Sequence, residues 1–167
     1  MMVIFRAFLL LAVFFGLASC GGSRGYNGPE VTQVLVYKEN RTMYLMHHGR
    51  ALKKYDIGLG FAPQGHKSQE GDGRTPEGAY VIDRRNPNSK FHLSVGISYP
   101  NAADVAKAKE MGVEPGGDIF IHGQPNRAKG KKLPQRDWTA GCISVRNREI
   151  EQIFAMVRDG TPIYIHP

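Results

Sequence analysis

Most apolar residues of this chain fall in short segments that glycine, proline and charged residues separate. Short segments rich in β-branched and aromatic residues between turn residues are typical of strands. Two stretches have a helical pattern instead: residues 101–111, and a segment after Asn147, which is expected to cap it. With 167 residues the chain has room for one ordinary domain. The pattern therefore predicts a mostly β fold with about two peripheral helices and strands at 31–37, 41–46, 51–60, 79–84, 91–99, 118–122, 142–145 and 161–166.

Local patterns refine this arrangement. Residues 31–37 and 41–46 flank a short polar turn and predict a hairpin. Residues 118–122 are apolar on both faces, which predicts an interior strand. A long loop is expected at 60–78, where glycine, proline and charged residues crowd. The second helix carries one apolar stripe that is expected to be buried: Ile150, Ile153, Phe154 and Val157.

The first thirty residues are not expected to belong to the fold. Arg6 precedes an uncharged apolar run at 7–18, which is too short to span a bilayer comfortably but suits a signal peptide. The run ends in Leu-Ala-Ser-Cys, which resembles the lipobox of bacterial lipoproteins, with Cys20 as the lipidated residue. An ordinary cleaved signal or an uncleaved anchor is the alternative. We expect a signal peptide at 1–19, the lipidated cysteine and a flexible tether at 20–30, and the folded domain at 31–167.

The chain has two cysteines, so lipidation of Cys20 would leave Cys142 as the one remaining thiol. Exported domains normally pair their cysteines. An unpaired Cys142 is therefore either an inert buried residue or one retained for its chemistry. A disulfide between Cys20 and Cys142 is a weaker alternative, because it would tie a glycine-rich tail to the domain.

His122-Gly123 and the block from Thr139 to Cys142 form the strongest chemical pattern. A cysteine that attacks an amide carbonyl needs to be a thiolate, and a nearby imidazole can remove the proton and return it to the leaving amine. Gly123 and Gly141 have no Cβ, so a substrate carbonyl can approach the backbone closely. Backbone amides near Cys142 are candidate donors to a tetrahedral oxyanion.

These residues resemble the signature of the L,D-transpeptidase catalytic domain family (the YkuD type), in which His-Gly is followed, after a loop, by Ser/Thr-His-Gly-Cys. Sixteen residues separate His122 from Thr139 here. Upstream, residues 73–80 (GRTPEGAY) resemble the Thr-Pro-x-Gly-x-aromatic element of the family. The likeness extends over about residues 31–165. It is greatest to a subgroup with Asp-Trp-Thr-x-Gly-Cys, which includes members that cut peptidoglycan links.

The resemblance implies a β-rich mixed sandwich in which Cys142 is the nucleophile and His122 the general base and acid. Thr139, Gly141 and Gly123 would support the site. No cofactor is implied, and a zinc site at His122 and Cys142 lacks a close ligand pair in the sequence. The family commonly orients its histidine with a backbone carbonyl. Asp137 is an alternative orienting group, although capping of its own loop is the simpler interpretation.

Three further residues are candidates for the substrate groove. Arg74 precedes the Thr-Pro element. His66 lies in the long loop, and a solvated loop residue is an equally good interpretation of it. Trp138, the single tryptophan, forms either a wall of the site or packing beneath it. The loop between the catalytic residues is basic, and is either a solvated loop or a lid that attracts carboxylates: Arg127, Lys129, Lys131, Lys132 and Arg136.

Two positions depart from the family pattern. Ala140 stands where many members have histidine, and Ser144 stands where many have an arginine that helps to hold a substrate carboxylate. The implied reaction is attack of Cys142 on the third residue's carbonyl in a tetrapeptide stem, loss of D-alanine, and transfer of the acyl group to an amine of a second stem. The alternatives are a hydrolase (carboxypeptidase or amidase) of the same chemistry and a non-catalytic peptidoglycan-binding lipoprotein.

The formal net charge of +7 favours acidic partners. These are anionic lipid headgroups or the carboxylates of peptidoglycan stem peptides. The export signal argues against nucleic acid as a partner. We therefore expect a monomer in the cell envelope, facing the periplasm and attached to the membrane through its N-terminal lipid anchor.

Overall fold

The computed structural model describes residues 26–128 and 136–167. The predicted signal peptide, Cys20 and Lys129 to Lys132 lie outside these ranges. Eight strands are present, β1 (Gln33–Tyr37), β2 (Thr42–His47), β3 (Arg50–Asp56), β4 (Gly78–Asn86), β5 (Ser94–Ile97), β6 (Phe120–His122), β7 (Ile143–Ser144) and β8 (Pro162–His166). The helices are α1 (Ala102–Glu110), α2 (Asn147–Met156) and a short 3₁₀ turn, η1 (Asn126–Ala128). The predicted mostly β class with two helices is confirmed.

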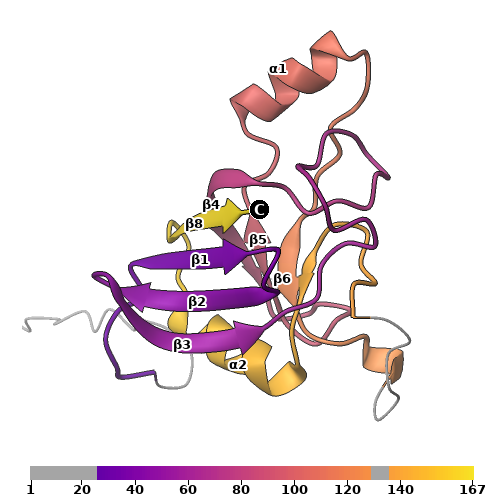
Figure 1. The fold of residues 1–167 in the computed structure, drawn as a ribbon. Helices are drawn as coiled ribbons and strands as arrows, with labels where there is room; N and C mark the ends of the chain where they lie inside the picture. Colours follow the sequence, from indigo (N-terminus) through magenta and orange to yellow (C-terminus); the bar gives the residue numbers. More distant parts are fainter. Residues whose placement is uncertain (1–25, 129–135) are drawn as a thin grey trace, which may run out of the picture.

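The strands form one mixed, curled sheet in the order β3-β2-β1-β8-β4-β5-β6-β7. Strands β1 and β8 are parallel, as are β6 and β7, and the other neighbours are antiparallel. Strand β4 pairs with β8 on one side and β5 on the other, and its register shifts between Ile82 and Arg84. This irregularity lies where the sheet folds into two layers, with β1 to β3 in front of β5 and β6 in Figure 1.

The core lies between these layers. Strands β1 and β8 alternate buried residues with more exposed ones, whereas every residue of β5 is buried. In β1, Val34 and Val36 are fully buried. The predicted hairpin is present, with Leu35 opposite Tyr44. Strand β6 lies between β5 and β7, so the prediction of an interior strand is also confirmed.

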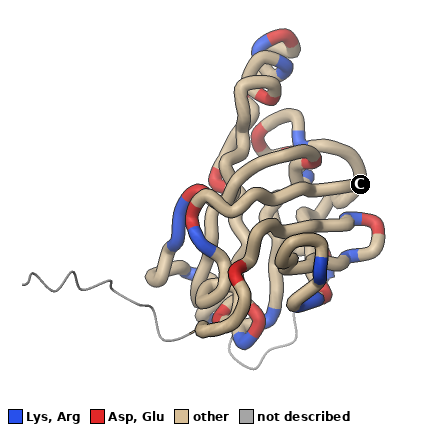
Figure 2. The backbone as a smooth tube through the Cα atoms, turned by 90° about the vertical axis from the view of Figure 1, so that its left-hand side faces the viewer, with Lys and Arg blue, Asp and Glu red and all other residues tan. Residues whose placement is uncertain are grey.

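The two helices have different relations to the sheet. Helix α2 packs against β5 and β6. Of the predicted stripe, Ile150, Ile153 and Val157 are buried, whereas Phe154 is only half-buried. Helix α1 stands out from the body and buries Ala108 alone (Figure 1). No helix within 26–128 and 136–167 has the length and apolarity needed to cross a membrane. In the view of Figure 2, basic and acidic residues are interspersed along the tube.

The start of α2 differs from the prediction. Asn147 was expected to cap the helix, but it is its first residue, and Arg146 occupies the cap position. The Glu149 carboxylate accepts a hydrogen bond of 2.9 Å from the Arg146 backbone N–H. Asn147 is used elsewhere, because its Oδ1 accepts a bond of 2.7 Å from the Gln124 backbone N–H. A tertiary partner thus displaces the local cap.

The segment after β3 does not continue as a strand, although 51–60 was predicted to be one. It forms isolated bridges instead, from Gly58 to Ser144 and from Gly60 to Thr139. Here two backbones approach closely, since a Cβ on Gly60 would lie 2.0 Å from the Gly73 carbonyl oxygen. Glycine at position 60 therefore lets three chain segments meet around the turn that precedes β7.

Replacement of Gly60 by alanine is expected to lower the free energy of unfolding by about 1–3 kcal/mol, because backbone must move to admit the methyl group. Urea unfolding followed by circular dichroism measures this. Gly117→Ala is the matched control, since the nearest atom to its Cβ would be Pro100 Cδ at 3.9 Å. Equal losses of stability in the two variants would contradict the interpretation.

Candidate active site

Two short parallel strands position the candidate catalytic residues. Strand β6 pairs with β7 so that Ile121 lies opposite Ile143 and His122 lies opposite Ser144. Side chains alternate between the two faces of a strand pair. Ile121 and Ile143 are fully buried in the core. His122 and Ser144 therefore share the other face.

Cys142 directly precedes β7, so the same alternation places it on the face of His122. Extended by one residue, the β6–β7 register sets Cys142 opposite Phe120, which is two residues before His122 on the neighbouring strand. Strand spacing and rise then give a Cα separation of roughly 8 Å. A cysteine and a histidine side chain that extend toward each other can span this separation. The fold thus brings together two residues that lie 20 positions apart in the sequence.

The Cys142 thiol is partly exposed, and its Sγ lies 3.5 Å from the Asp118 carbonyl oxygen. Burial raises the pKa of the thiol above its ordinary value of 9.0. A hydrogen bond from the Phe120 backbone and the positive charge of Lys67 oppose this rise, and the Asp118 carboxylate adds to it. Cys142 therefore rests as a neutral thiol near pH 7 and needs a base before it can attack.

His122 is almost fully buried, and its Nδ1 lies 2.7 Å from the Gly123 carbonyl oxygen. Because a carbonyl only accepts, Nδ1 carries the proton and the other ring nitrogen, Nε2, keeps its lone pair. Burial lowers the pKa of His122 below 6.5, and the Gly123 carbonyl partly opposes this. Phe91 and Trp138 enclose the ring, with centroids 4.5 and 5.6 Å away. The imidazole is thus a neutral base held in one tautomer.

The turn before Cys142 is fixed by Thr139. Its hydroxyl donates a bond of 2.6 Å to the Cys142 carbonyl oxygen and accepts one of 3.2 Å from the Gly141 N–H. Gly141 has φ of 137°, and a Cβ there would lie 2.7 Å from the Arg74 carbonyl oxygen. The Cys142 N–H makes no hydrogen bond to another residue of the described ranges. It is therefore the free candidate for an oxyanion donor at this turn.

Asp137 anchors the loop that carries the nucleophile. Its carboxylate accepts bonds from Nε and Nη2 of Arg41, the latter at 2.9 Å, and one of 2.9 Å from the Leu59 N–H. Its carboxylate is thus occupied away from His122, whose Nδ1 is held by Gly123 instead. These contacts argue against an orienting role for Asp137. They also differ from capping of its own loop, because Asp137 ties that loop to two distant segments at Arg41 and Leu59.

Residues 32–165 match the family described as the L,D-transpeptidase catalytic domain (YkuD). The chain belongs to this family. In Escherichia coli (strain K12), "Putative L,D-transpeptidase YafK" is 28% identical over 135 residues, which are 74% of this chain and 46% of that protein. The match of the family to nearly all described residues agrees with the order of motifs along the chain.

Solved structures support the same assignment. The helical cell shape determining protein Pgp2 from Campylobacter jejuni has a TM-score of 0.64 and 31% identity, and the match covers 84% of this chain and 49% of Pgp2. The L,D-transpeptidase from Xylanimonas cellulosilytica has a TM-score of 0.54 and 12% identity over 84% of this chain and 63% of that one, which shows the shared fold. The chain spans about half the length of YafK and Pgp2.

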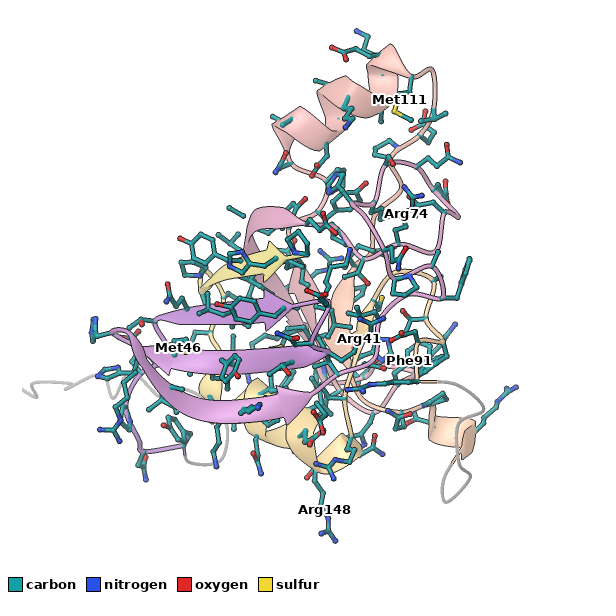
Figure 3. The ribbon with its side chains drawn as sticks, in the orientation of Figure 1. Arg41, Met46, Arg74, Phe91, Met111 and Arg148 are labelled. Atoms are coloured by element: carbon teal, nitrogen blue, oxygen red, sulfur yellow. The ribbon has the colours of Figure 1, made fainter. Side chains whose placement is uncertain are left out.

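The groove candidates occupy different places around this L,D-transpeptidase site. Trp138 packs edge-on against His122. The Arg74 side chain is exposed on the long loop, and its carbonyl oxygen is the one that lies against Gly141 (Figure 3). His66 has both ring nitrogens engaged, Nδ1 at the Glu77 backbone and Nε2 at 3.1 Å from Asp104. A substrate role for these three residues stays a prediction.

Several residues of the site have no signal in the sequence. Phe91 lies far from the motifs in the sequence, yet its ring centroid is 4.5 Å from that of His122. Arg41 lies at the turn between β1 and β2, and nothing in the sequence around it indicates its ion pair with Asp137. Lys67 is buried, and its Nζ donates to Gln69 and Asp72 within the long loop. Within the described part of the chain, no cluster of three His, Cys, Asp or Glu side chains suits a metal ion.

The raised pKa of Cys142 predicts how its alkylation depends on pH. The rate of modification by iodoacetamide should rise about tenfold per pH unit from pH 6 and show no plateau below pH 9, because the thiolate is the reactive form. Peptide mass spectrometry assigns the label to Cys142 rather than Cys20. A plateau below pH 8 would show a preformed thiolate–imidazolium pair and contradict the neutral resting state.

Proposed function

We propose that this domain is a cysteine acyltransferase that acts on peptidoglycan stem peptides through a thioester at Cys142. The observation that carries the proposal is the β6–β7 register, which places Cys142 and His122 on one face. The tautomer of His122 supports it, because Nε2 remains the basic nitrogen. Partial exposure of the thiol favours this function over a binding protein with Cys142 in its core.

The reaction follows from these groups. His122 Nε2 removes the thiol proton as Sγ of Cys142 attacks the amide carbonyl of the stem. The Cys142 N–H stabilises the oxyanion of the tetrahedral intermediate. As the C–N bond breaks, His122 returns the proton to the leaving amine and a thioester remains. An amine of a second stem then attacks the thioester, His122 takes its proton, and the thiol is released.

Hydrolysis is the second candidate function, because water can replace the acceptor amine in the last step. The substitution of Ser144 for the family's frequent arginine is the observation that keeps it open. Pgp2 is named a determinant of helical cell shape. We propose a role in remodelling of the cell wall for this protein as well, whichever acceptor it uses.

Tetrapeptide muropeptides test the proposal. The wild-type protein should convert them to cross-linked dimers if it is a transferase, or to trimmed monomers alone if it is a hydrolase. Cys142→Ser and His122→Ala should each lower the rate by about 10³-fold or more, and the double variant should be no slower than the worse single variant, because the two residues act as a unit. Liquid chromatography with mass spectrometry separates the products.

His48→Ala is the matched control for this experiment, since His48 is an exposed histidine in the β2–β3 turn. It should keep wild-type turnover. Additive losses in the double variant would show that Cys142 and His122 do not work together. Absence of any turnover by the wild-type protein would leave the binding function.

We also propose that Cys20 carries the lipid anchor in the cell envelope. Cys20→Ser should release the protein from the membrane fraction or block its processing, because a serine cannot be thioether-lipidated. Membrane fractionation and immunoblotting measure both effects, and Cys142→Ser is the control for loss of a thiol elsewhere. A mature Cys20→Ser protein that stays membrane-bound would refute the anchor.

A further inference from the structure

A pocket of about 460 Å³ lies next to the candidate catalytic residues. Trp138 belongs both to this pocket and to the enclosure of His122. Ser144 also lines it and lies opposite His122 in the β6–β7 register. Neither Cys142 nor His122 lines the pocket itself, so it adjoins the candidate catalytic pair through Trp138 and Ser144. Its other lining residues are Asp56, Ile57, Gly58, Gln124, Arg136, Val145 and Arg146.

Two guanidinium groups line the pocket, on side chains that are 56% (Arg136) and 81% (Arg146) exposed, and each makes hydrogen bonds to acceptors of the protein. Arg136 Nε donates to the Ile57 carbonyl at 3.2 Å, and its Nη2 to the Arg41 carbonyl at 3.4 Å. Arg146 Nε donates to Glu149 at 2.9 Å, and its Nη2 contacts the same oxygen. For both arginines, Nη1 makes no hydrogen bond to another residue of 26–128 or 136–167. Two oriented donor groups thus remain for a ligand.

The acidic residues nearby leave room for an anion. Glu149 is committed to Arg146 and to the start of α2. Asp56 lies 3.9 Å from Arg136 and is 82% exposed, so water screens this contact. The orienting carboxylate of Glu149 therefore fixes Arg146 without using all of its donors.

At Gly58, which lines the pocket, the chain packs closely against its neighbours. A Cβ on Gly58 would lie 2.6 Å from Ser144 Oγ and 2.2 Å from the Arg136 carbonyl oxygen. Gln124 also lines the pocket, and its Nε2 donates to the Val145 carbonyl at 2.7 Å. Its Oε1 is buried and has no partner in the described residues, so it is not offered to a ligand.

We propose that this pocket binds a free carboxylate of the stem peptide, with Arg136 and Arg146 as its ligands. In this chain they replace the arginine that many family members carry at the position of Ser144. The inference rests on the proposed action on stem peptides and adds the group by which they are selected. A stem whose carboxylate is amidated loses the charge of the charge-assisted hydrogen bonds, so this site discriminates the two forms.

The test compares a tetrapeptide muropeptide whose diaminopimelyl carboxylate is free with the same compound amidated. Wild-type protein should favour the free acid by about 10- to 100-fold in kcat/KM. Arg136→Gln/Arg146→Gln should reduce this preference to near unity through a higher KM for the acid, with kcat little changed. Arg148→Gln is the matched control, because Arg148 lies on α2 and points away from the body (Figure 3).

A binding measurement separates the failure of this inference from failure of the proposed function. In Cys142→Ser protein, calorimetry should show tighter binding of the free acid, and the double arginine substitution should abolish the difference. The carboxylate site is refuted if the Cys142→Ser protein binds both compounds equally, or if the double variant keeps the preference. Binding that discriminates without any turnover in the wild-type protein would support the carboxylate site and refute the acyltransferase. Circular dichroism of the double variant confirms that it is folded.

Discussion

The parallel pairing of β6 with β7 is the constraint on which the site depends. The ladder is short, with β7 only two residues long, yet it sets the relation of Cys142 to His122. Its outer side is secured by the Gly58–Ser144 bridge, in which each residue's N–H donates to the other's carbonyl, at 2.9 and 2.8 Å. A strand this short has little stability alone. The contacts at its outer edge therefore help to hold the nucleophile in register.

The electrostatics of the pair follow from this placement. Burial disfavours both ions, so the resting state is thiol and neutral imidazole rather than thiolate and imidazolium. The imidazolium that forms during attack is supported by the Gly123 carbonyl, and it lies beside the Phe91 ring, whose centroid is 4.5 Å away. Both partners stabilise the charged form of His122. The site is therefore arranged to carry charge during the reaction and to stay neutral between turnovers.

The sequence predicts the elements of this fold better than their arrangement. Alternating apolar residues locate the strands, because a half-buried strand has a period of two. They carry no information on which strands pair, so the parallel contacts of β1 with β8 and β6 with β7 appear only in the structure. Asparagine is a residue type that often caps helices, but Asn147 is the first residue of α2 and its side chain instead accepts a tertiary hydrogen bond from the Gln124 N–H. Cys142 and His122 were accessible through the family motif, whereas Phe91 and Arg41 were not, since they reach the site from distant loops.

Placement of carboxylate recognition on Arg136 and Arg146 has a structural consequence for the enzyme. An arginine at position 144 would lie on the two-residue strand β7, which sets the position of the nucleophile. Arg136 lies in the loop before the nucleophile and Arg146 at the cap of α2, both outside that strand. Ser144 and Gly58 can then pack closely at the outer edge of β7, while the preference for a carboxylate is set by other residues. Substrate preference is thereby free to change by substitutions that leave the cysteine and histidine in place.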